Sequence, residues 1–272
     1  MCCLWCSNPE SQHSYKELAY FSDKCNGCGH CITSCQYGAI SREEVGCSIK
    51  VDFQKCTSCG ICTKTCYSEA LVLLGKEMSS EEVVRIASRD LPFYLRSGGG
   101  VTLSGGEPLF QVEFSSEILR LCKTKGINTT IQTSGYAEKS DFDVILPYLD
   151  LIIFDIKHLD PKEHKKGTGL ENKKIIQNLK YLNSVKSNLI LQIALIPGYN
   201  DSEDHLEAVF SLARELESIQ GVSLLAYHSL GVSKHKRLGR KYLLSDISTP
   251  SRDYLDKKKV WAKQFGVPLI SF

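Results

Sequence analysis

The feature that most constrains this chain is a pair of matching cysteine-rich segments. The first copy, CNGCGHCITSCQYGAI, runs from Cys25 to Ile40, and the second, CTSCGICTKTCYSEAL, runs from Cys56 to Leu71. The copies start 31 residues apart, and both space their cysteines as Cys-x2-Cys-x2-Cys-x3-Cys. We therefore expect a small domain over residues 25–75, preceded by a short cysteine-bearing segment at 1–24.

The number and position of the cysteines indicate metal binding. Twelve of the 13 cysteines lie within the first 66 residues, and the 206 residues that follow contain only Cys122, inside a helical pattern. A secreted disulfide scaffold would be a short chain with few other elements. We therefore expect a reducing, cytoplasmic compartment and cysteines that act as metal thiolates.

The spacing within each copy favours 4Fe–4S clusters. Three closely spaced thiolates on one loop can reach three irons of a cube, and the fourth thiolate reaches the other cluster. The two expected ligand sets are Cys25, Cys28, Cys31 and Cys66, and Cys56, Cys59, Cys62 and Cys35. The alternative is a pair of structural zinc sites, which usually combine two Cys-x2-Cys pairs across a longer gap. Cys47, outside the repeat, is expected to be a small buried side chain.

The remainder of the chain, residues 76–272, alternates helical and strand patterns. Helices are expected at 79–95, 111–125, 171–184, 201–218 and 249–265. Strands are expected at VTLSG, INTTIQT, DLIIFDIK, NLILQIALIPG, VSLLAYH and VPLISF. This alternation predicts an α/β fold with a parallel sheet and right-handed crossovers, in the form of a partial TIM-like (β/α)6 barrel.

Polar motifs follow the expected strands: SGGEP, QTSGY, DIKH, IPGYND and YHSLG. Active sites of barrels lie at the carboxyl ends of the strands, so these motifs predict one site. Singly, each has an ordinary explanation. Gly105 and Gly106 could form only a turn, Asp155 and Lys157 a solvated strand end, and His228 a core histidine. Their joint occurrence at successive strand ends favours the site.

Charge and hydropathy exclude other classes. The formal net charge is +2, and no apolar run approaches the roughly 20 residues of a membrane span. The first residues also lack the basic and apolar segments of a signal peptide. We expect a monomer that binds neither nucleic acid nor membrane.

Cys3-x2-Cys6, the two-cluster repeat, GGGVTLSGGEPLFQ, TIQTSGYA, IIFDIKHLD, LIPGYNDS and LLAYHSLGVSKHKRLGRKY occur in this order. In that order they closely resemble radical S-adenosylmethionine enzymes, and within them the glycyl-radical-enzyme activating enzymes such as pyruvate formate-lyase-activating enzyme. The resemblance covers essentially the whole chain. It implies a radical-type partial barrel with an inserted bacterial-ferredoxin-like domain.

The resemblance also implies roles for single residues. Cys3 and Cys6 would be two of the three ligands of a third 4Fe–4S cluster, whose open iron binds S-adenosylmethionine. Gly105, Gly106 and Glu107 would receive its methionine amino group, and Lys157 its carboxylate. Ser134 would lie near the ribose, His228 against the adenosyl group, and Asp155 would face a monovalent cation or the cofactor.

The activity implied is reductive cleavage of S-adenosylmethionine to a 5′-deoxyadenosyl radical, which generates a glycyl radical on a partner glycyl radical enzyme. A flavodoxin or a ferredoxin-type protein would supply the electron. Two alternatives remain open: a radical enzyme that acts on a small molecule, and an electron-transfer protein with an inactive barrel.

The chain departs from the family pattern at several positions. The family loop is Cys-x3-Cys-x2-Cys, so its first cysteine would precede Met1, and we expect a truncated sequence or a misplaced start. Gln132 stands where an acidic cation ligand is expected, and Gln192 where an arginine is common. The segment Ser233–Lys241 is expected to be a basic loop, with partner docking and simple solvation both open.

Overall fold

The computed structural model describes residues 1–43 and 48–271, so the expectation for Cys47 lies outside the described residues. The chain forms two compact units. The large unit comprises Met1–Leu4, Met78–His228 and Ile247–Phe272, and the small unit comprises Trp5–Glu77 and Ser229–Asp246. The domain boundaries expected from sequence, after residues 24 and 75, differ from this division. It assigns most of the amino-terminal segment, and a segment near the carboxyl end, to the small unit.

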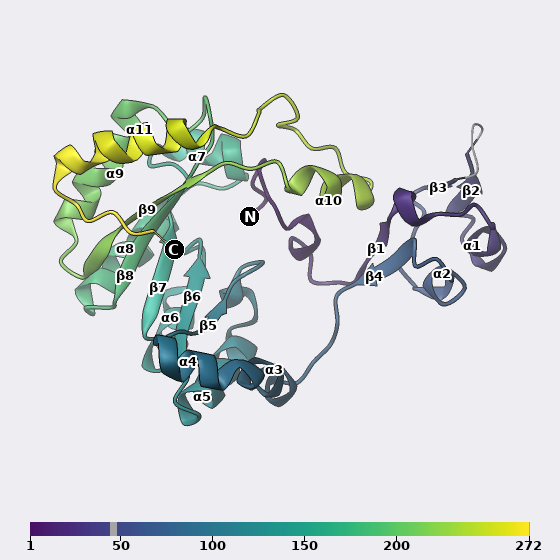
Figure 1. Ribbon diagram of the computed structural model, residues 1–272, viewed down its shortest axis with the longest axis horizontal. Coiled ribbons are helices and arrows are strands. Elements are labelled where there is room, and N and C mark those ends of the chain that lie inside the picture. The colour runs from purple at the N-terminus through teal and green to yellow at the C-terminus, as the bar shows by residue number, and fades with distance from the viewer. Residues whose placement is uncertain (44–47, 272) are drawn as a thin grey trace. The chain divides into compact units, whose positions relative to one another are not determined.

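The large unit is built on a parallel sheet whose five strands follow one another in sequence order (Figure 1). The strands are β5 (Gly100–Leu103), β6 (Asn128–Thr133), β7 (Leu151–Asp155), β8 (Leu189–Leu195) and β9 (Ile219–Ala226). The predicted parallel α/β architecture is therefore confirmed. The sixth expected strand, VPLISF, contributes only a parallel bridge between Leu269 and Val222. Because all strands are parallel, their carboxyl ends lie at the same edge.

Helices precede, connect and follow the strands of this sheet. They are α3 (Ser80–Ala87), α4 (Leu91–Ser97), α5 (Val112–Thr124), α6 (Lys139–Ile145), α7 (Pro161–Thr168), α8 (Lys173–Ser184), α9 (Glu203–Glu215) and α11 (Arg252–Ala262). Short 3-10 helices lie at Ser88–Asp90, Pro108–Gln111, Leu146–Tyr148 and Lys263–Phe265. The single helix expected at 79–95 is instead divided, with Pro92 in the first turn of α4, where its missing N–H costs least.

Two helices of the large unit, α6 and α7, were not predicted from the sequence. Both carry recognisable start signals. Glu138 and Asp141 form a capping box at α6, and the Asp160 side chain accepts from the N–H groups of Lys162 and Glu163 at α7, directly before Pro161. Both helices are too short for hydrophobic periodicity to predict them, although their capping signals are present in the sequence.

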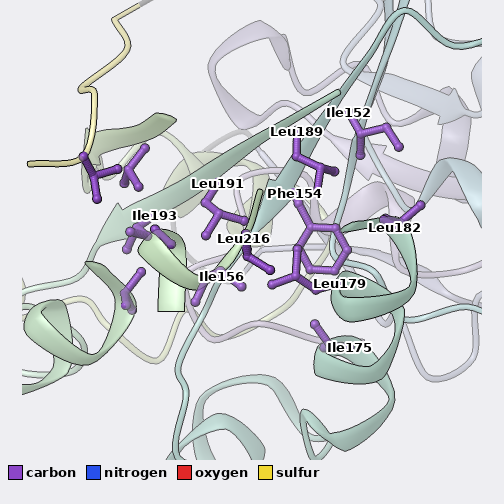
Figure 2. Packing of buried hydrophobic residues seen from close by; sticks show 14 of the residues in the cluster. Ile152, Phe154, Ile156, Ile175, Leu179, Leu182, Leu189, Leu191, Ile193 and Leu216 are labelled. Atoms are coloured by element: carbon purple, nitrogen blue, oxygen red, sulfur yellow. The ribbon is translucent and has the colours of Figure 1, made fainter. Parts of the chain in front are cut away.

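The core of the large unit lies between the sheet and its helices. Figure 2 shows Phe154 of β7 beside the side chains of Leu179 and Leu182 from α8, and Leu191 of β8 belongs to the same cluster. All four are fully buried. Burying side chains of this size stabilises a fold by about 1.5–3 kcal/mol each, so the strand ends stand on a rigid support.

The amino-terminal part of the small unit contains, in its described residues, two short antiparallel sheets and two short α-helices. Strand β1 (Glu17–Tyr20) pairs with β4 (Leu71–Leu74), and β2 (Ile40–Arg42) pairs with β3 (Ile49–Val51). Helices α1 (His30–Ser34) and α2 (Ile61–Lys64) follow the cysteine loops, and 3-10 helices lie at Pro9–Ser11 and Ser22–Lys24.

The sequence repeat is also a repeat of backbone conformation. Positive φ angles occur at Gly27, Gly29 and Gly38, and again 31 residues later at Ser58, Gly60 and Glu69. Helices α1 and α2 begin at matching positions of the two copies. The two cysteine loops therefore have the same local fold.

The segment Ser229–Asp246 belongs to the small unit and corrects the expectation of a basic loop. Helix α10 (Gly231–Arg237) covers half of the predicted loop. The Lys234 ammonium donates to Glu10 and to Asn8, at 2.8 Å in each case, and Arg240 pairs with Glu17. Two of the basic side chains thus bind the amino-terminal part of the same unit.

Within residues 1–43 and 48–271, no helix has the length and hydrophobicity of a membrane span.

Candidate functional site

Glu107 lies after β5 and is fixed by the end of β6. Its Oε1 accepts a hydrogen bond from Thr133 Oγ1 at 2.6 Å, and its Oε2 accepts from the Ser134 N–H at 2.9 Å and from Ser134 Oγ at 2.6 Å. The Leu109 N–H also donates to Oε1, at 3.4 Å, so four donors hold this acidic side chain at the carboxyl edge of the sheet. Ser134, expected near a ribose, contacts Glu107.

The backbone before Glu107 is open. Gly105 has a φ of +106°, which side-chain-bearing residues rarely adopt, and the space where a Cβ would stand is empty. Gly105 and Gly106 are both exposed. The turn thus leaves bare backbone beside the Glu107 carboxylate, where a ligand can approach closely.

Asp155 and Lys157 form an ion pair at the end of β7. The Lys157 ammonium lies 3.0 Å from Asp155 Oδ2, and each side chain is only 14% exposed. Burial by itself would lower the pKa of Lys157, but Asp155, and to a lesser extent Cys3 and Glu107, raise it above its usual value. Lys157 is therefore a fixed positive charge between acidic neighbours.

Two glutamines complete the surroundings of Asp155. Gln192 Nε2 donates to Asp155 Oδ1 at 2.9 Å, and the strand register places these residues opposite each other. Gln132 Nε2 lies 3.5 Å from Asp155 Oδ2, while its Oε1 accepts from Ser104 Oγ at 3.0 Å. From sequence these glutamines were only departures from a pattern, and their shared contact with Asp155 was missed.

Asn200, in the IPGYND motif, has a structural part. It is fully buried, and its Nδ2 donates to the carbonyl groups of Lys157 at 3.0 Å and Ala194 at 2.9 Å. Its Oδ1 accepts from the Ile196 N–H at 2.7 Å. Asn200 thus joins the ends of β7 and β8 and holds the backbone of Lys157 in place.

The end of α7 holds the residues on both sides of Cys3. The Cys2 N–H donates to the Thr168 carbonyl at 3.0 Å, and the Leu4 N–H donates to the Gly167 carbonyl at 2.9 Å. A side chain at 167 would collide with Tyr199, because a Cβ there would lie 2.3 Å from its hydroxyl oxygen. Cys3 also raises the pKa of Tyr199, second to burial, which indicates that the two side chains are neighbours.

Two further residues expected in the site are His228 and Cys6. His228 is exposed, two residues beyond β9. Cys6 is part of the small unit, whereas Cys3 is part of the large unit. Cys6 is half-buried, and its carbonyl contacts His235 Nε2 at 3.1 Å within the small unit.

In the small unit, one pocket brings together four cysteines from both copies of the repeat: Cys35, Cys56, Cys59 and Cys62. Leu18, Ile40 and Ile61 also line it. Burial, followed by the nearby Cys56, Cys35 and Cys59, raises the pKa of Cys62 to about 11. These are the four cysteines grouped from the sequence as one ligand set.

The other four cysteines are grouped in the same way. Burial raises the pKa of the Cys31 thiol, and three neighbouring thiols add to the shift: Cys66, Cys25 and Cys28. Residues 1–43 and 48–271 contain no group of three or more cysteine, histidine or acidic side chains arranged to hold a metal ion. In each set, three thiols are near enough to the most buried cysteine to raise its pKa, and four thiolates are the donor set of a 4Fe–4S cluster.

Comparison with known proteins identifies the family. The radical SAM superfamily model matches residues 2–209. The isethionate sulfite-lyase activating enzyme of Nitratidesulfovibrio vulgaris is 39% identical over 254 residues, or 90% of this chain and 81% of that protein. The choline trimethylamine-lyase activating enzyme of Oleidesulfovibrio alaskensis is 36% identical over 273 residues, or 98% of this chain and 87% of that protein.

A solved structure supports the same assignment. A domain of pyruvate-formate lyase-activating enzyme from Bacteroides vulgatus superposes with a TM-score of 0.53 at 25% identity, over 64% of this chain and 98% of that one. The radical SAM family implies a 4Fe–4S cluster and S-adenosylmethionine. The chain belongs to the radical SAM superfamily and, within it, to the glycyl-radical-enzyme activating enzymes.

Proposed function

We propose that the carboxyl edge of the parallel sheet binds S-adenosylmethionine and that the chain uses it to generate a glycyl radical on a partner enzyme. The observation that carries this proposal is the pairing of opposite charges at neighbouring strand ends. Glu107 presents a carboxylate held by four donors, and Lys157 presents an ammonium held by Asp155. An amino acid has one group for each of these charges.

The roles of single residues follow from this arrangement. Glu107 accepts a charge-assisted hydrogen bond from the amino group of the cofactor, and the bare backbone at Gly105 and Gly106 lets it approach. Lys157 binds its carboxylate. Ser134 orients Glu107 and lies near the ribose, and the exposed His228 covers the adenosyl group.

Asp155 orients Lys157 in this scheme. Its two oxygens face the donors of Lys157, Gln192 and Gln132. Asp155 therefore acts on the cofactor through Lys157, whose charge it maintains.

The cysteines hold the iron–sulfur groups. Cys3 and Cys6 are ligands of the radical cluster, and α7 holds the backbone around Cys3. When bound, this cluster supplies the electron that cleaves S-adenosylmethionine and yields a radical able to remove a hydrogen atom from glycine. The small unit is a ferredoxin-like insert whose two cysteine sets hold two further 4Fe–4S clusters. The parallel sheet is part of a partial barrel, with residues 267–271 beside β9.

The partner is a glycyl radical enzyme, and a flavodoxin or ferredoxin-type protein supplies electrons. The two relatives above are named for different lyases, one for isethionate sulfite-lyase and one for choline trimethylamine-lyase. The family therefore serves several partners, and genes beside this one are the first place to look for its own.

The test is an oxygen-free reaction of the iron-loaded chain, a reductant, S-adenosylmethionine and the partner encoded nearby, read by electron paramagnetic resonance. We expect a glycyl radical signal, at least tenfold weaker for Glu107→Gln because the amino group loses its ionised acceptor. Glu113→Gln, an exposed glutamate on α5, is the matched control and should match the unmodified chain. Equal signals from the unmodified chain and Glu107→Gln would refute the role of this site.

A further inference from the structure

The two cysteine sets differ at one matched position of the repeat. In the second copy, Ser68 Oγ lies 3.6 Å from Cys66 Sγ, within hydrogen-bonding reach of a sulfur atom. The position that matches Ser68 in the first copy, two residues after Cys35, is Tyr37. The Tyr37 side chain is 51% exposed and has no hydroxyl on its Cβ. One set therefore has a serine hydroxyl beside its fourth thiolate where the other has a tyrosine.

Backbone donors also contact these two sulfurs. The Ala39 N–H donates to Cys35 Sγ at 3.4 Å, and the N–H groups of Ser68, Ala70 and Leu71 are directed at Cys66. Cys66 thus has both backbone and side-chain donors, and Ser68 Oγ is the side-chain donor that a substitution can remove.

Solvent exposure does not separate the two sets either. Cys31 is 6% exposed and Cys62 is 7% exposed. Cys28 and Cys59 are both exposed, and the other ligands are all half-buried. Solvent exposure also tunes the reduction potential of a cluster, but it is similar for the two sets. The hydrogen bonds to sulfur do differ between the sets and can therefore separate their potentials.

We propose that the cluster held by Cys25, Cys28, Cys31 and Cys66 has the higher reduction potential of the two, and that the Ser68 hydroxyl contributes to this difference. A hydrogen bond to a ligand sulfur stabilises the added negative charge of the reduced cluster. One electron from an external one-electron reductant enters the cluster, and no bond forms or breaks. The first electron taken up by the small unit then resides on the cluster that Cys66 helps to hold. This inference rests on the proposed function only in that both sets hold 4Fe–4S clusters.

The test measures the midpoint potentials of the two clusters by electron paramagnetic resonance of redox-poised samples. The full chain carries Cys3→Ala and Cys6→Ala, so that only the small-unit clusters contribute. We expect two potentials. Ser68→Ala should lower the higher potential and leave the lower potential unchanged. Ser68→Thr keeps the hydroxyl and should retain the higher potential.

The reciprocal change is Tyr37→Ser, which places a hydroxyl beside Cys35 and should raise the lower potential alone. Ser34→Ala is the matched control. Its hydroxyl lies next to ligand Cys35 in sequence but donates to the Cys31 carbonyl and contacts Thr65 Oγ1, so both potentials should remain.

Iron analysis separates the possible failures. About eight irons per chain, four per cluster, show that both sets are loaded. Loaded protein in which neither Ser68→Ala nor Tyr37→Ser moves one potential selectively would overturn this inference and leave the proposed function intact. Protein that binds zinc in place of iron would overturn both. If the Ser68→Ala protein loses iron, the test rests on Tyr37→Ser, because Tyr37 is exposed and its replacement should not disturb the fold.

Discussion

The two units of this chain are stabilised by different means. The large unit has an extensive apolar core, with residues such as Phe154 and Leu191 fully buried between strands and helices. One buried apolar cluster in the described part of the small unit consists of Leu18, Cys31, Ile40, Ile49, Cys62 and Leu71, and two of its six members are expected cluster ligands. The large unit can therefore fold on apolar burial, whereas we expect the folding of the small unit to depend on what its cysteines bind.

Removal of iron should give the largest effect and tests this comparison directly. Without metal, the small unit keeps too little apolar area to offset its chain entropy, so its amides should exchange as in an unfolded chain. The amides of β5–β9 should stay protected. Hydrogen exchange read by mass spectrometry checks both. Continued protection of residues 17–20 and 71–74 in iron-free protein would show that the small unit folds unaided.

A cavity in the large unit should destabilise that unit and spare the small unit, the opposite of the effect expected from iron removal. Phe154→Ala removes a ring that is fully buried and packs directly under Gly135, and should destabilise the large unit by about 3–5 kcal/mol. The cluster absorbance of the small unit should persist at denaturant concentrations that unfold the sheet. Phe110→Ala, at a side chain 70% exposed, is the control and should have little effect. Simultaneous loss of both signals would show that the units unfold as one.

Acidification should weaken the large unit through His205. Burial, and next the stacked His158, lowers the pKa of His205 from 6.5 to about 4. The unfolded chain therefore binds a proton near pH 6.5 that the folded unit does not take up until about pH 4. This contribution is complete above pH 6.5 and is lost as the pH falls, by about 2 kcal/mol between pH 7 and pH 5.

Urea denaturation of the large unit at the two pH values measures this loss. His205→Phe keeps a ring against His158 and removes the titrating group, so its stability should change less with pH. The same pH slope in His205→Phe and the unmodified chain would assign the loss to other groups.

The smallest expected effect is a gain in the stability of the small unit. Glu69 has a φ of +53°, at the position where the first copy of the repeat has Gly38. Glu69→Gly relieves the left-handed strain and should stabilise the unit by about 1 kcal/mol. Slower loss of cluster absorbance in denaturant is the readout. Faster loss would show that the Glu69 side chain makes a contact more valuable than the relief of strain.

Much of this organisation was predictable because the decisive signals are local. The 31-residue repeat gave the two cysteine sets, and strand and helix periodicities gave the parallel sheet. The assignment of Ser229–Asp246 to the small unit was not predictable, since it depends on long-range pairs such as Lys234 with Glu10. The same holds for the glutamines around Asp155. Nothing in the sequence near Gln192 reveals that the strand register places it opposite Asp155.

The most direct test of the central claim is whether the reduced, iron-loaded chain cleaves S-adenosylmethionine in the absence of oxygen. The account predicts 5′-deoxyadenosine as a product, and a strong reduction in its yield for Lys157→Ala, which removes the cation at the sheet edge. If protein loaded with iron and sulfide at Cys3 and Cys6 forms no 5′-deoxyadenosine, the sheet edge is not the radical-forming site described above.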